Sequence, residues 1–315
     1  MPSPQPAAAH FADRLAAAVV AKGNPVLVGL DPRFGQLPAA LRKAGAADYA
    51  GQAEAFRKFC EGVIDVVAPL VPAVKPQAAF FEQLGPAGMT ALAEVIRYAR
   101  KQGLLVIVDG KRNDIGSTAT AYAEGYLGDE QSSAWAGDAL TVSPYLGEDS
   151  LEPFVETAGE RGAGIFVLVK TSNPGGGMFQ DLVADGRPIY RHVAEYVERI
   201  AAATTGECGY GLAGAVVGAT YPNQAAELRS AMPHAWFLVP GYGSQGATAR
   251  DVSSSFDMQG LGAIVNNSRG IIFAHARKEY VELGEARWQD AVAAATNSMI
   301  DELRADTPAG KLGRR

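Results

Sequence analysis

The stretch Leu104–Thr118, with the sequence LLVIVDGKRNDIGST, changes from apolar to strongly charged within a few residues. Its first part is a run of Leu, Val and Ile. A short apolar run rich in β-branched residues predicts a strand that is buried on both faces. Such strands are typical of parallel sheets covered by helices on both sides. The stretch therefore indicates an α/β protein.

The charged part of the same stretch places Asp109, Lys111 and Asp114 close together. Side chains two residues apart on an extended chain point the same way, so we expect Asp109 and Lys111 to converge just past the end of the strand. Asp114 lies three residues further on, where we expect the chain to turn. An ammonium group between two carboxylates is a proton donor held in place. Taken alone, D-x-K-x-x-D is more often a solvated charged loop, because short motifs recur by chance.

Short apolar strands alternate with helical segments along the whole chain. Seven further strands are predicted at Val26–Leu30, Ala73–Lys75, Ala139–Ser143, Ile165–Lys170, Ala213–Gly218, Trp236–Val239 and Ala263–Val265. Helical spacing of apolar residues predicts helices at His10–Lys22, Gln52–Val67, Met89–Lys101, Ser150–Ala158, Ile189–Ala203, Asn223–Ala231 and roughly His275–Arg304. Regular βα alternation implies parallel pairing with right-handed crossovers.

Eight βα units close naturally into a TIM (β/α)8 barrel, which is the fold that we predict. A doubly wound open sheet is the alternative, but its G-x-G-x-x-G is missing, because the first strand ends in GLDPRFG. We expect one barrel domain over residues 1–315, with an extra N-terminal helix and flexible ends at about 1–9 and 306–315. Gly125–Gly137 and Gly175–Gly186 are interpreted as loop insertions.

Composition excludes several classes of protein. The 315 residues are 48% hydrophobic and 20% charged, as in an ordinary globular protein, and the formal net charge of −6 argues against a general nucleic-acid partner. The two cysteines, Cys60 and Cys208, form no disulfide framework, and no histidine spacing suggests a metal site. The N-terminus lacks the features of a signal peptide, and no apolar run is long enough to span a membrane. We therefore expect a cytoplasmic protein with no membrane partner.

Polar residues follow the predicted strands repeatedly, at the face where barrels carry their active sites. They are Asp31 after the first strand, Lys75 at the second, Asp109 with Lys111 at the third, Thr171 and Ser172 after the fifth, Gly241–Gly246 after the seventh, and Arg269 with Gly270 after the eighth. Loops after strands seven and eight are the usual phosphate site of such barrels, where backbone N–H groups approach the anion and an arginine grips it.

Each of these residues also has an ordinary structural explanation. An Asp-Pro pair such as Asp31 with Pro32 often forms a simple turn. Lys75 could point to solvent, and Arg269 could pair with an acid at the rim. Gly175–Gly177 is most simply a flexible linker. If the site had no function, all of these ordinary explanations would have to hold at once, at strand ends on one face of the barrel. That coincidence favours the functional interpretation.

Taken together, these motifs resemble the orotidine 5′-monophosphate decarboxylase family. The resemblance rests on GLDPR, AVKPQ, DGKRND, TSNPG, PGYGSQG and SRG, which run from the first strand to the eighth. KPQAAFFE and DGKRNDIG resemble the longer subgroup found in many bacteria (type 2). The resemblance implies a homodimeric barrel that converts orotidine 5′-monophosphate to uridine 5′-monophosphate and carbon dioxide in pyrimidine biosynthesis, without a metal or an organic cofactor.

The resemblance also implies a role for each matching residue. Lys75, Asp109, Lys111 and Asp114 correspond to a catalytic tetrad of charges. Asp31 and Lys75 would hold the ribose hydroxyls, Ser172 would read the pyrimidine edge, and Gln245, Arg269 and Gly270 would hold the phosphate, with Gln245 also reaching towards the base. Asp114 and Thr118 would enter the site of the partner subunit. The segment NNSRG departs from the family, which often has an apolar residue and glycine before the arginine.

Two alternatives stay open at this point. Related barrels that act on sugar phosphates share D-x-K-x-x-D, but they need a divalent metal held by an acid after the second strand. Lys75 stands at that place here, and its positive charge would repel the metal. A barrel that binds a nucleotide phosphate without catalysis would explain the glycine-rich loops, but it would leave the charged tetrad unexplained, because an unneeded buried cluster costs stability.

Overall fold

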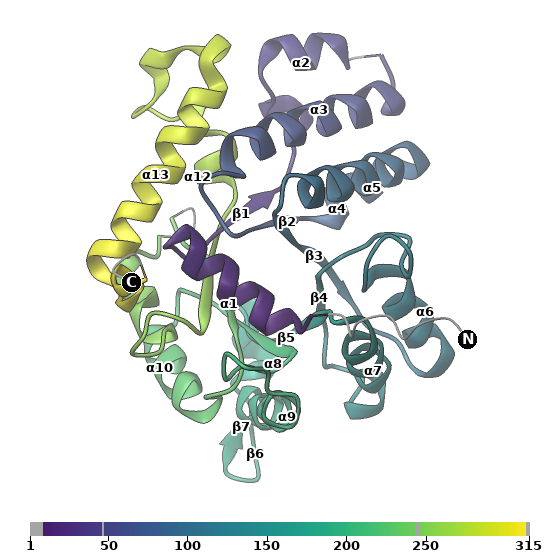
Figure 1. Ribbon diagram of the computed structural model, residues 1–315, viewed down its shortest axis with the longest axis vertical. Helices are drawn as coiled ribbons and strands as arrows, with labels where there is room; N and C mark the ends of the chain where they lie inside the picture. The colour runs from purple at the N-terminus through teal and green to yellow at the C-terminus, as the bar shows by residue number, and fades with distance from the viewer. Residues whose placement is uncertain (1–8, 46, 244–245, 313–315) are drawn as a thin grey trace.

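The computed structural model describes residues 9–45, 47–243 and 246–312, and eight parallel strands form a closed barrel in it. Around the barrel the order is β1-β10-β9-β8-β5-β4-β3-β2, and helices surround it (Figure 1). The predicted TIM barrel is thus confirmed, and the open sheet is excluded. The barrel strands are β1 (Val26–Leu30), β2 (Ala73–Pro76), β3 (Leu105–Arg112), β4 (Ala139–Val142), β5 (Gly164–Lys170), β8 (Ala213–Val217), β9 (Phe237–Val239) and β10 (Ala263–Asn267).

Helices follow the strands, as the alternation in the sequence predicts. The α-helices are α1 (Phe11–Lys22), α2 (Ala39–Ala44), α3 (Tyr49–Val67), α4 (Ala78–Glu82), α5 (Gly85–Lys101), α6 (Gly116–Tyr126), α7 (Glu152–Arg161), α8 (Gly177–Gln180), α9 (Ile189–Ala203), α10 (Pro222–Ala231), α11 (Ala249–Val252), α12 (Arg269–Ile272) and α13 (Trp288–Asp306). Short 3₁₀ helices are η1 (Phe34–Gln36), η2 (Glu148–Ser150), η3 (Pro174–Gly176), η4 (Ser253–Ser255), η5 (Ala274–Ala276), η6 (Val281–Leu283), η7 (Glu285–Arg287) and η8 (Pro308–Lys311).

The extra N-terminal helix α1 lies across the N-terminal ends of the strands, in front of the barrel in the view of Figure 1. Its Phe11 side chain is buried and occupies the space where a Cβ at Gly164, the first residue of β5, would lie. Further along, Asp13 accepts hydrogen bonds from the backbone N–H groups of Glu207 and Cys208, and His10 contacts the carbonyl oxygen of Thr204. The helix thereby closes the end of the barrel opposite the polar loops.

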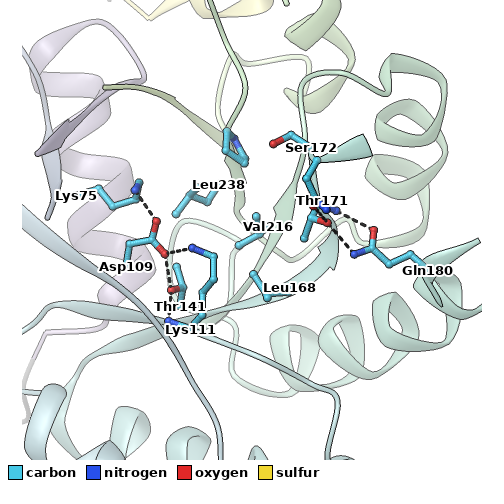
Figure 2. A pocket seen from close by; sticks show the side chains of 12 residues that line it. Lys75, Asp109, Lys111, Thr141, Leu168, Thr171, Ser172, Gln180, Val216 and Leu238 are labelled. Atoms are coloured by element: carbon cyan, nitrogen blue, oxygen red, sulfur yellow. Dashed lines mark hydrogen bonds and ion pairs between the residues drawn. The ribbon is translucent and has the colours of Figure 1, made fainter. Parts of the chain in front are cut away.

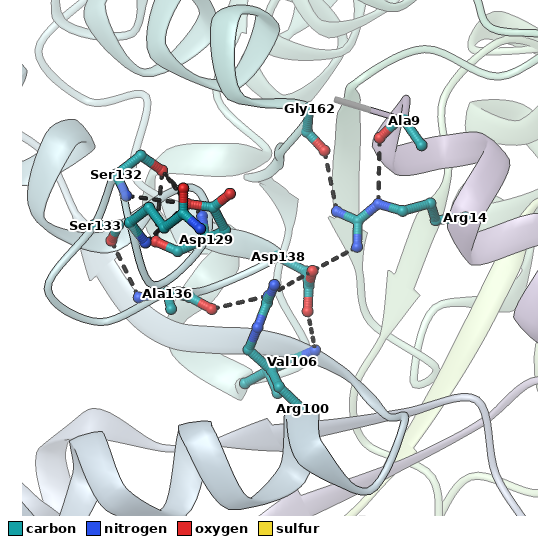
Figure 3. Close-up of polar contacts among 11 residues, drawn as sticks. Ala9, Arg14, Arg100, Val106, Asp129, Ser132, Ser133, Ala136, Asp138 and Gly162 are labelled. Atoms are coloured by element: carbon teal, nitrogen blue, oxygen red, sulfur yellow. Dashed lines mark hydrogen bonds and ion pairs between the residues drawn. The ribbon is translucent and has the colours of Figure 1, made fainter. Parts of the chain in front are cut away.

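A buried carboxylate fixes the same end of the barrel (Figure 3). Asp138 directly precedes β4 and is 2% exposed. One of its oxygens lies 2.6 Å from Arg14 of α1 and 2.7 Å from Arg100 of α5, and the other accepts a hydrogen bond from the backbone N–H of Val106 at 2.8 Å. Asp138 therefore joins α1, α5 and β3 at one point, and we call this cluster the Asp138 clamp.

Elements outside the barrel strands differ from the predictions at several points. The expected helix over roughly His275–Arg304 begins only at Trp288, because η5, η6 and η7 occupy the preceding residues and Gly284 has a φ of 72°. No helix was predicted over Gly116–Tyr126, where α6 forms. Within the predicted flexible end at about 306–315, the described residues up to 312 are packed: η8 forms over Pro308–Lys311, and Ala309 and Leu312 are buried.

The insertion Gly175–Gly186 is folded over part of its length. It contains α8 and one strand of a small antiparallel hairpin, β6 (Val183–Ala184), which pairs with β7 (Arg187–Pro188). The hairpin projects away from the barrel below α9 (Figure 1). Within the described residues, no helix has the length and apolar character needed to cross a lipid bilayer.

Candidate active site

The site begins at the end of β3, where the strand departs from regular geometry. The register of β3 against β4 shifts between Val108 and Arg112, and Lys111 has a φ of 46°. That value lies in the left-handed region, which costs energy for a residue with a side chain. The backbone N–H of Lys111 is held by the hydroxyl of Thr141 on β4 at 2.9 Å. The bulge, rather than the simple alternation of an extended chain, turns Lys111 back towards Asp109.

Asp109 is the hub of the charged cluster, shown in Figure 2. Its Oδ2 accepts hydrogen bonds from the Lys75 ammonium at 2.6 Å and from the Gln77 amide at 3.0 Å. Its Oδ1 accepts from the Lys111 ammonium at 2.6 Å and from the Thr141 hydroxyl at 2.9 Å. Lys75, Asp109, Lys111 and Thr141 come from β2, β3 and β4, which are neighbours in the barrel, and Gln77 directly follows β2. Two cations therefore share one carboxylate at the C-terminal ends of the strands.

Burial and charge act in opposite directions on this cluster. Burial alone would raise the pKa of Asp109, but the ammonium groups of Lys75 and Lys111 outweigh it and hold the pKa of Asp109 well below its ordinary value. Burial would likewise lower the pKa of Lys75, but the negative charges of Asp109 and Asp31 raise it above its ordinary value. Asp109 and Lys75 thus form an ion pair throughout the neutral range.

Across from this cluster, the cavity carries uncharged polar groups (Figure 2). Thr171 and Ser172 follow β5, and Gln180 of α8 donates to the Thr171 hydroxyl at 2.8 Å. Apolar side chains separate the two polar sides. The cavity has a volume of about 450 Å³ and is lined by Lys75, Asp109, Lys111, Thr141, Leu168, Thr171, Ser172, Asn173, Gln180, Val216, Leu238 and Pro240. A flat organic ring with polar edges would fit such a space.

Five of the residues predicted for the site lie outside this lining: Asp31, Asp114 and Thr118, and also Arg269 and Gly270 after β10. Oδ1 of Asp31 is buried without a hydrogen-bond partner among the described residues, and Asp31 is close enough to influence Lys75. Asp114 accepts a hydrogen bond from the backbone N–H of Ile115, and Thr118 lies exposed on α6. The structure therefore brings Lys75, Asp109, Lys111 and Ser172 to one cavity, but it does not bring Asp114 or Thr118 there.

The loops after β9 and β10 supply a second polar region. Gly241, Gly243 and Gly246 all have positive φ, with values of 102°, 67° and 92°, so this loop needs glycine at these positions. Arg269 and Gly270 begin α12, and the N–H of Gly270 donates to the side chain of Asn267 at 3.2 Å. Gln245, which the sequence places in the same region, lies outside the described residues.

Three polar residues of the site were not predicted from the sequence. Gln77 stands two residues after Lys75, so its position just past a strand end was a usable signal. Thr141 lies in the middle of a predicted strand and gave no such signal. Gln180 lies in an insertion and gave no signal. Among the residues that the structure describes, no three His, Cys, Asp or Glu side chains are grouped so that they could hold a metal ion.

A (β/α)8 barrel with a charged cluster and an uncharged polar wall at the C-terminal ends of its strands defines a barrel enzyme with a small-molecule site. Comparison with known proteins makes the assignment specific. The chain belongs to the Orotidine 5'-phosphate decarboxylase / HUMPS family, whose model matches residues 26–283.

Individual relatives agree with this assignment. The chain is 58% identical over 298 residues to the orotidine 5'-phosphate decarboxylase of Rhodopirellula baltica, and the match covers 93% of this chain and 99% of that protein. It is 42% identical to the corresponding protein of Deinococcus radiodurans over 88% of this chain and 93% of that one. The structure of Leishmania donovani OMP decarboxylase is similar with a TM-score of 0.71 and 33% identity, covering 94% of this chain and 98% of that one.

Proposed function

We propose that this chain converts orotidine 5′-monophosphate to uridine 5′-monophosphate and carbon dioxide. The observation that carries the proposal is the Lys75–Asp109–Lys111 cluster at the mouth of the barrel, with both lysines 2.6 Å from one carboxylate. Family membership and the names of the relatives over most of the chain support the same reaction.

The chemistry explains why a fixed cation is needed. Loss of carbon dioxide from C6 of the pyrimidine leaves a carbanion that the ring delocalises poorly. Its negative charge appears only in the transition state, so a site accelerates the reaction by stabilising charge at that point. The Lys111 ammonium is held in place by Asp109 before substrate arrives, and a preorganised cation of this kind costs no reorganisation during the reaction. Lys111 then transfers a proton to C6.

The buried carboxylate of Asp109 has a second effect. A substrate carboxylate bound beside Lys111 would lie close to the negative charge of Asp109, which stays ionised because its pKa is lowered. Repulsion between the two groups is relieved when carbon dioxide leaves. The stabilisation of the developing carbanion by Lys111 is the larger contribution in this account, because it acts directly on the transition state.

The remaining residues of the site contact three parts of the nucleotide: the ribose, the base and the phosphate. Asp31 and Lys75 hold the ribose hydroxyls, and the hydroxyl of Ser172 reads the edge of the pyrimidine. Arg269, Gly270 and Gln245 hold the phosphate. The glycines of the loop after β9 and the position of Arg269 directly after β10 support this assignment, since small residues let backbone N–H groups approach an anion and an arginine can bind it.

We infer that two copies of the chain share their active sites, with Asp114 and Thr118 of each subunit completing the site of the other. Asp114 and Thr118 are missing from the described lining of their own cavity. The segments around them also expose large apolar side chains, including Ile115, Tyr122, Tyr145 and Leu146. Large exposed apolar side chains of this kind would be buried by a partner subunit. The cytoplasmic location expected from the sequence stays a prediction.

The sugar-phosphate reactions of related barrels are the second candidate. Lys75 near the end of β2 argues against them: its side chain is 4% exposed and its ammonium is bonded to Asp109, so that carboxylate already neutralises an internal cation. A divalent metal would have to displace Lys75 from it. A binding protein without catalysis is disfavoured by the bulge at Lys111, because a strained residue with φ 46° that aims a cation into a cavity has a cost without a benefit.

A turnover assay separates the three possibilities. Purified protein is treated exhaustively with EDTA and then incubated with orotidine 5′-monophosphate, while uridine 5′-monophosphate and carbon dioxide are both measured. We expect full activity. Activity that is lost with EDTA and restored by magnesium would favour the sugar-phosphate relatives, and tight nucleotide binding without turnover would favour the binding protein.

A further inference from the structure

The end of β5 carries a charged residue that the reaction does not use. Lys170 is fully buried, at 0% exposure, and forms an ion pair with Asp181, which follows α8 in the insertion. Its ammonium also lies 4.5 Å from the ring centre of Tyr221 and 5.5 Å from that of Tyr190. Both rings offer the cation a favourable face. Asp181 is the carboxylate paired with Lys170 within the described part of the chain.

This pair links the insertion to the barrel. The side chain of Asp181 is half-exposed, whereas Lys170 has no contact with water. A buried ammonium without a carboxylate is strongly unfavourable, so departure of Asp181 would leave Lys170 with the two aromatic rings alone. The insertion is therefore held against β5 by the need to neutralise a buried charge.

Gln180, the residue before Asp181, binds Thr171, the residue after Lys170. Oε1 of Gln180 accepts a hydrogen bond from the backbone N–H of Thr171 at 3.0 Å, and Nε2 of Gln180 donates to the Thr171 hydroxyl at 2.8 Å. Two consecutive residues of the insertion thus bind two consecutive residues at the end of β5. The contacts leave Thr171 with a fixed backbone and a fixed side chain.

Ser172 comes next in the chain and is contacted on its other side by the residues that follow β8. A Cβ at Gly218 would lie 2.7 Å from the backbone nitrogen of Ser172, so only glycine permits this approach. The hydroxyl of Thr220 donates to the carbonyl oxygen of Ser172 at 3.3 Å. The position of the Ser172 hydroxyl therefore depends on the residues after β8 on one side and on the insertion on the other.

We propose that Lys170 and Asp181 are positioning residues: their ion pair fastens the α8 segment to β5 so that Gln180 fixes Thr171 and Ser172 is presented to the base of the nucleotide. The proposal rests on the role given to Ser172 in the proposed function. It assigns a purpose to an insertion whose glycines suggested no more than a flexible linker.

The test compares two ligands that share the phosphate and ribose but differ in the base. Binding of uridine 5′-monophosphate and of ribose 5-phosphate is measured by calorimetry for the wild type, Asp181→Asn, Lys170→Met and the double variant. Asp181→Asn should weaken binding of uridine 5′-monophosphate by about tenfold or more, the usual cost of losing a charge-assisted contact. Its affinity for ribose 5-phosphate should stay within about twofold of the wild-type value, because the proposed phosphate contacts lie in the loops after β9 and β10, away from the insertion.

The double variant Lys170→Met/Asp181→Asn distinguishes a loss of positioning from a failure of Asp181→Asn to fold. It removes the buried charge together with its partner, so its melting temperature should exceed that of Asp181→Asn, while its base-specific loss should persist. Glu195→Gln is the matched control, because it breaks the exposed Arg187–Glu195 pair beside the same insertion and should bind both ligands normally. Unchanged affinity for uridine 5′-monophosphate in the double variant, or equal losses for both ligands, would overturn the proposal.

Ser172→Ala separates this inference from the proposed function. If Ser172→Ala loses affinity for the base-containing ligand and Asp181→Asn does not, Ser172 reads the base but the ion pair does not position it. If Asp181→Asn loses that affinity and Ser172→Ala keeps it, positioning through Ser172 is wrong. Absence of turnover in the wild type would refute the proposed function itself.

Discussion

The ammonium of Lys111 lies 2.6 Å from Oδ1 of Asp109, although Lys111 follows a bulge and has a φ of 46°. In a regular strand the side chains of these two residues would stand in parallel. Here the backbone of Lys111 is turned so that its side chain returns to the carboxylate and stays accessible from the cavity. A strained backbone conformation at Lys111 therefore positions its ammonium group, and the effect of this position can be tested.

Lys111→Ala should abolish turnover without abolishing nucleotide binding. The kcat for orotidine 5′-monophosphate should fall by at least about 1,000-fold, because the variant loses both the cation and the proton donor. Affinity for uridine 5′-monophosphate should change by less than about threefold, since the phosphate is held elsewhere. Steady-state kinetics and calorimetry measure the two effects, with Lys101→Ala on the exposed end of α5 as the control. Residual activity within about tenfold of wild type would be too large for this role.

Mixing two inactive variants tests whether Asp114 serves the partner's site. Lys111→Ala and Asp114→Ala should each be inactive alone. In a mixed dimer with shared sites, one site carries both defects and the other carries neither. Random exchange makes about half of the dimers mixed, so about a quarter of wild-type activity should return. If Asp114 acts within its own chain, exchange restores nothing.

Arg269→Ala should affect phosphorylated ligands selectively. Affinity for uridine 5′-monophosphate should fall by at least about tenfold, as expected for the loss of a bidentate phosphate contact. Affinity for uridine should stay nearly unchanged. Arg250→Ala is a suitable control, because Arg250 is an exposed arginine of α11, the helix that follows the β9 loop. Equal losses for the two ligands in calorimetry would show that Arg269 acts on folding instead.

Asp138→Ala should destabilise the fold and leave the chemistry intact. The change removes a buried carboxylate that two arginines and the N–H of Val106 contact, so the free energy of unfolding should fall by about 3 kcal/mol. Urea unfolding measures the loss, and Glu130→Gln on the exposed loop nearby is the control. At temperatures where the variant is folded, its kcat should equal that of the wild type. A change below about 0.5 kcal/mol would show that water replaces the clamp without cost.

His275 should make stability depend on pH below neutrality. Partial burial lowers the pKa of His275 below its ordinary value of 6.5, and the positive charge of Arg42 acts in the same direction, against Glu285. The unfolded chain therefore binds the proton more readily than the folded chain. The contribution of His275 to the free energy of unfolding is fully present above pH 6.5, and it is lost as the pH falls through the lower pKa of the folded protein. Urea unfolding between pH 8 and 5 should show a smaller decline for His275→Gln than for the wild type, and parallel curves would contradict this account.

The barrel was predictable because each of its strands is a short apolar run, bounded by polar residues or glycine. Burial on both faces demands such runs, so the pattern is almost unambiguous for β1, β5 and β8. The charged cluster was predictable for the same reason, since strand ends meet at one face of the barrel. Lys75 and Asp109, which are separated along the chain by α4 and α5, come together as expected.

Other features depend on information that local patterns do not contain. The return of Lys111 to Asp109 requires a bulge supported by Thr141 on another strand. The helix α6 has the sequence GSTATAYAEGY, which is rich in residues with low helix propensity, so contacts with the rest of the fold must stabilise it. In the region before α13, Gly284 indicated a possible break in the helix, but the helical spacing of apolar residues continued across it. The contacts of Gln180 and Asp181 arise only once the insertion has folded.

The position of α1 has a consequence for the order of events during synthesis. Phe11, Asp13 and Arg14 leave the ribosome well before the residues that they contact, which are Gly164, Cys208 and Asp138. The docking surface of the helix is complete only after Cys208 has been made, and an isolated segment of this length is marginal in water. Nascent chains arrested before residue 208 should therefore leave the N-terminal segment open to proteases. Docking of the first helix is then a late step, which seals the barrel after its central strands have assembled.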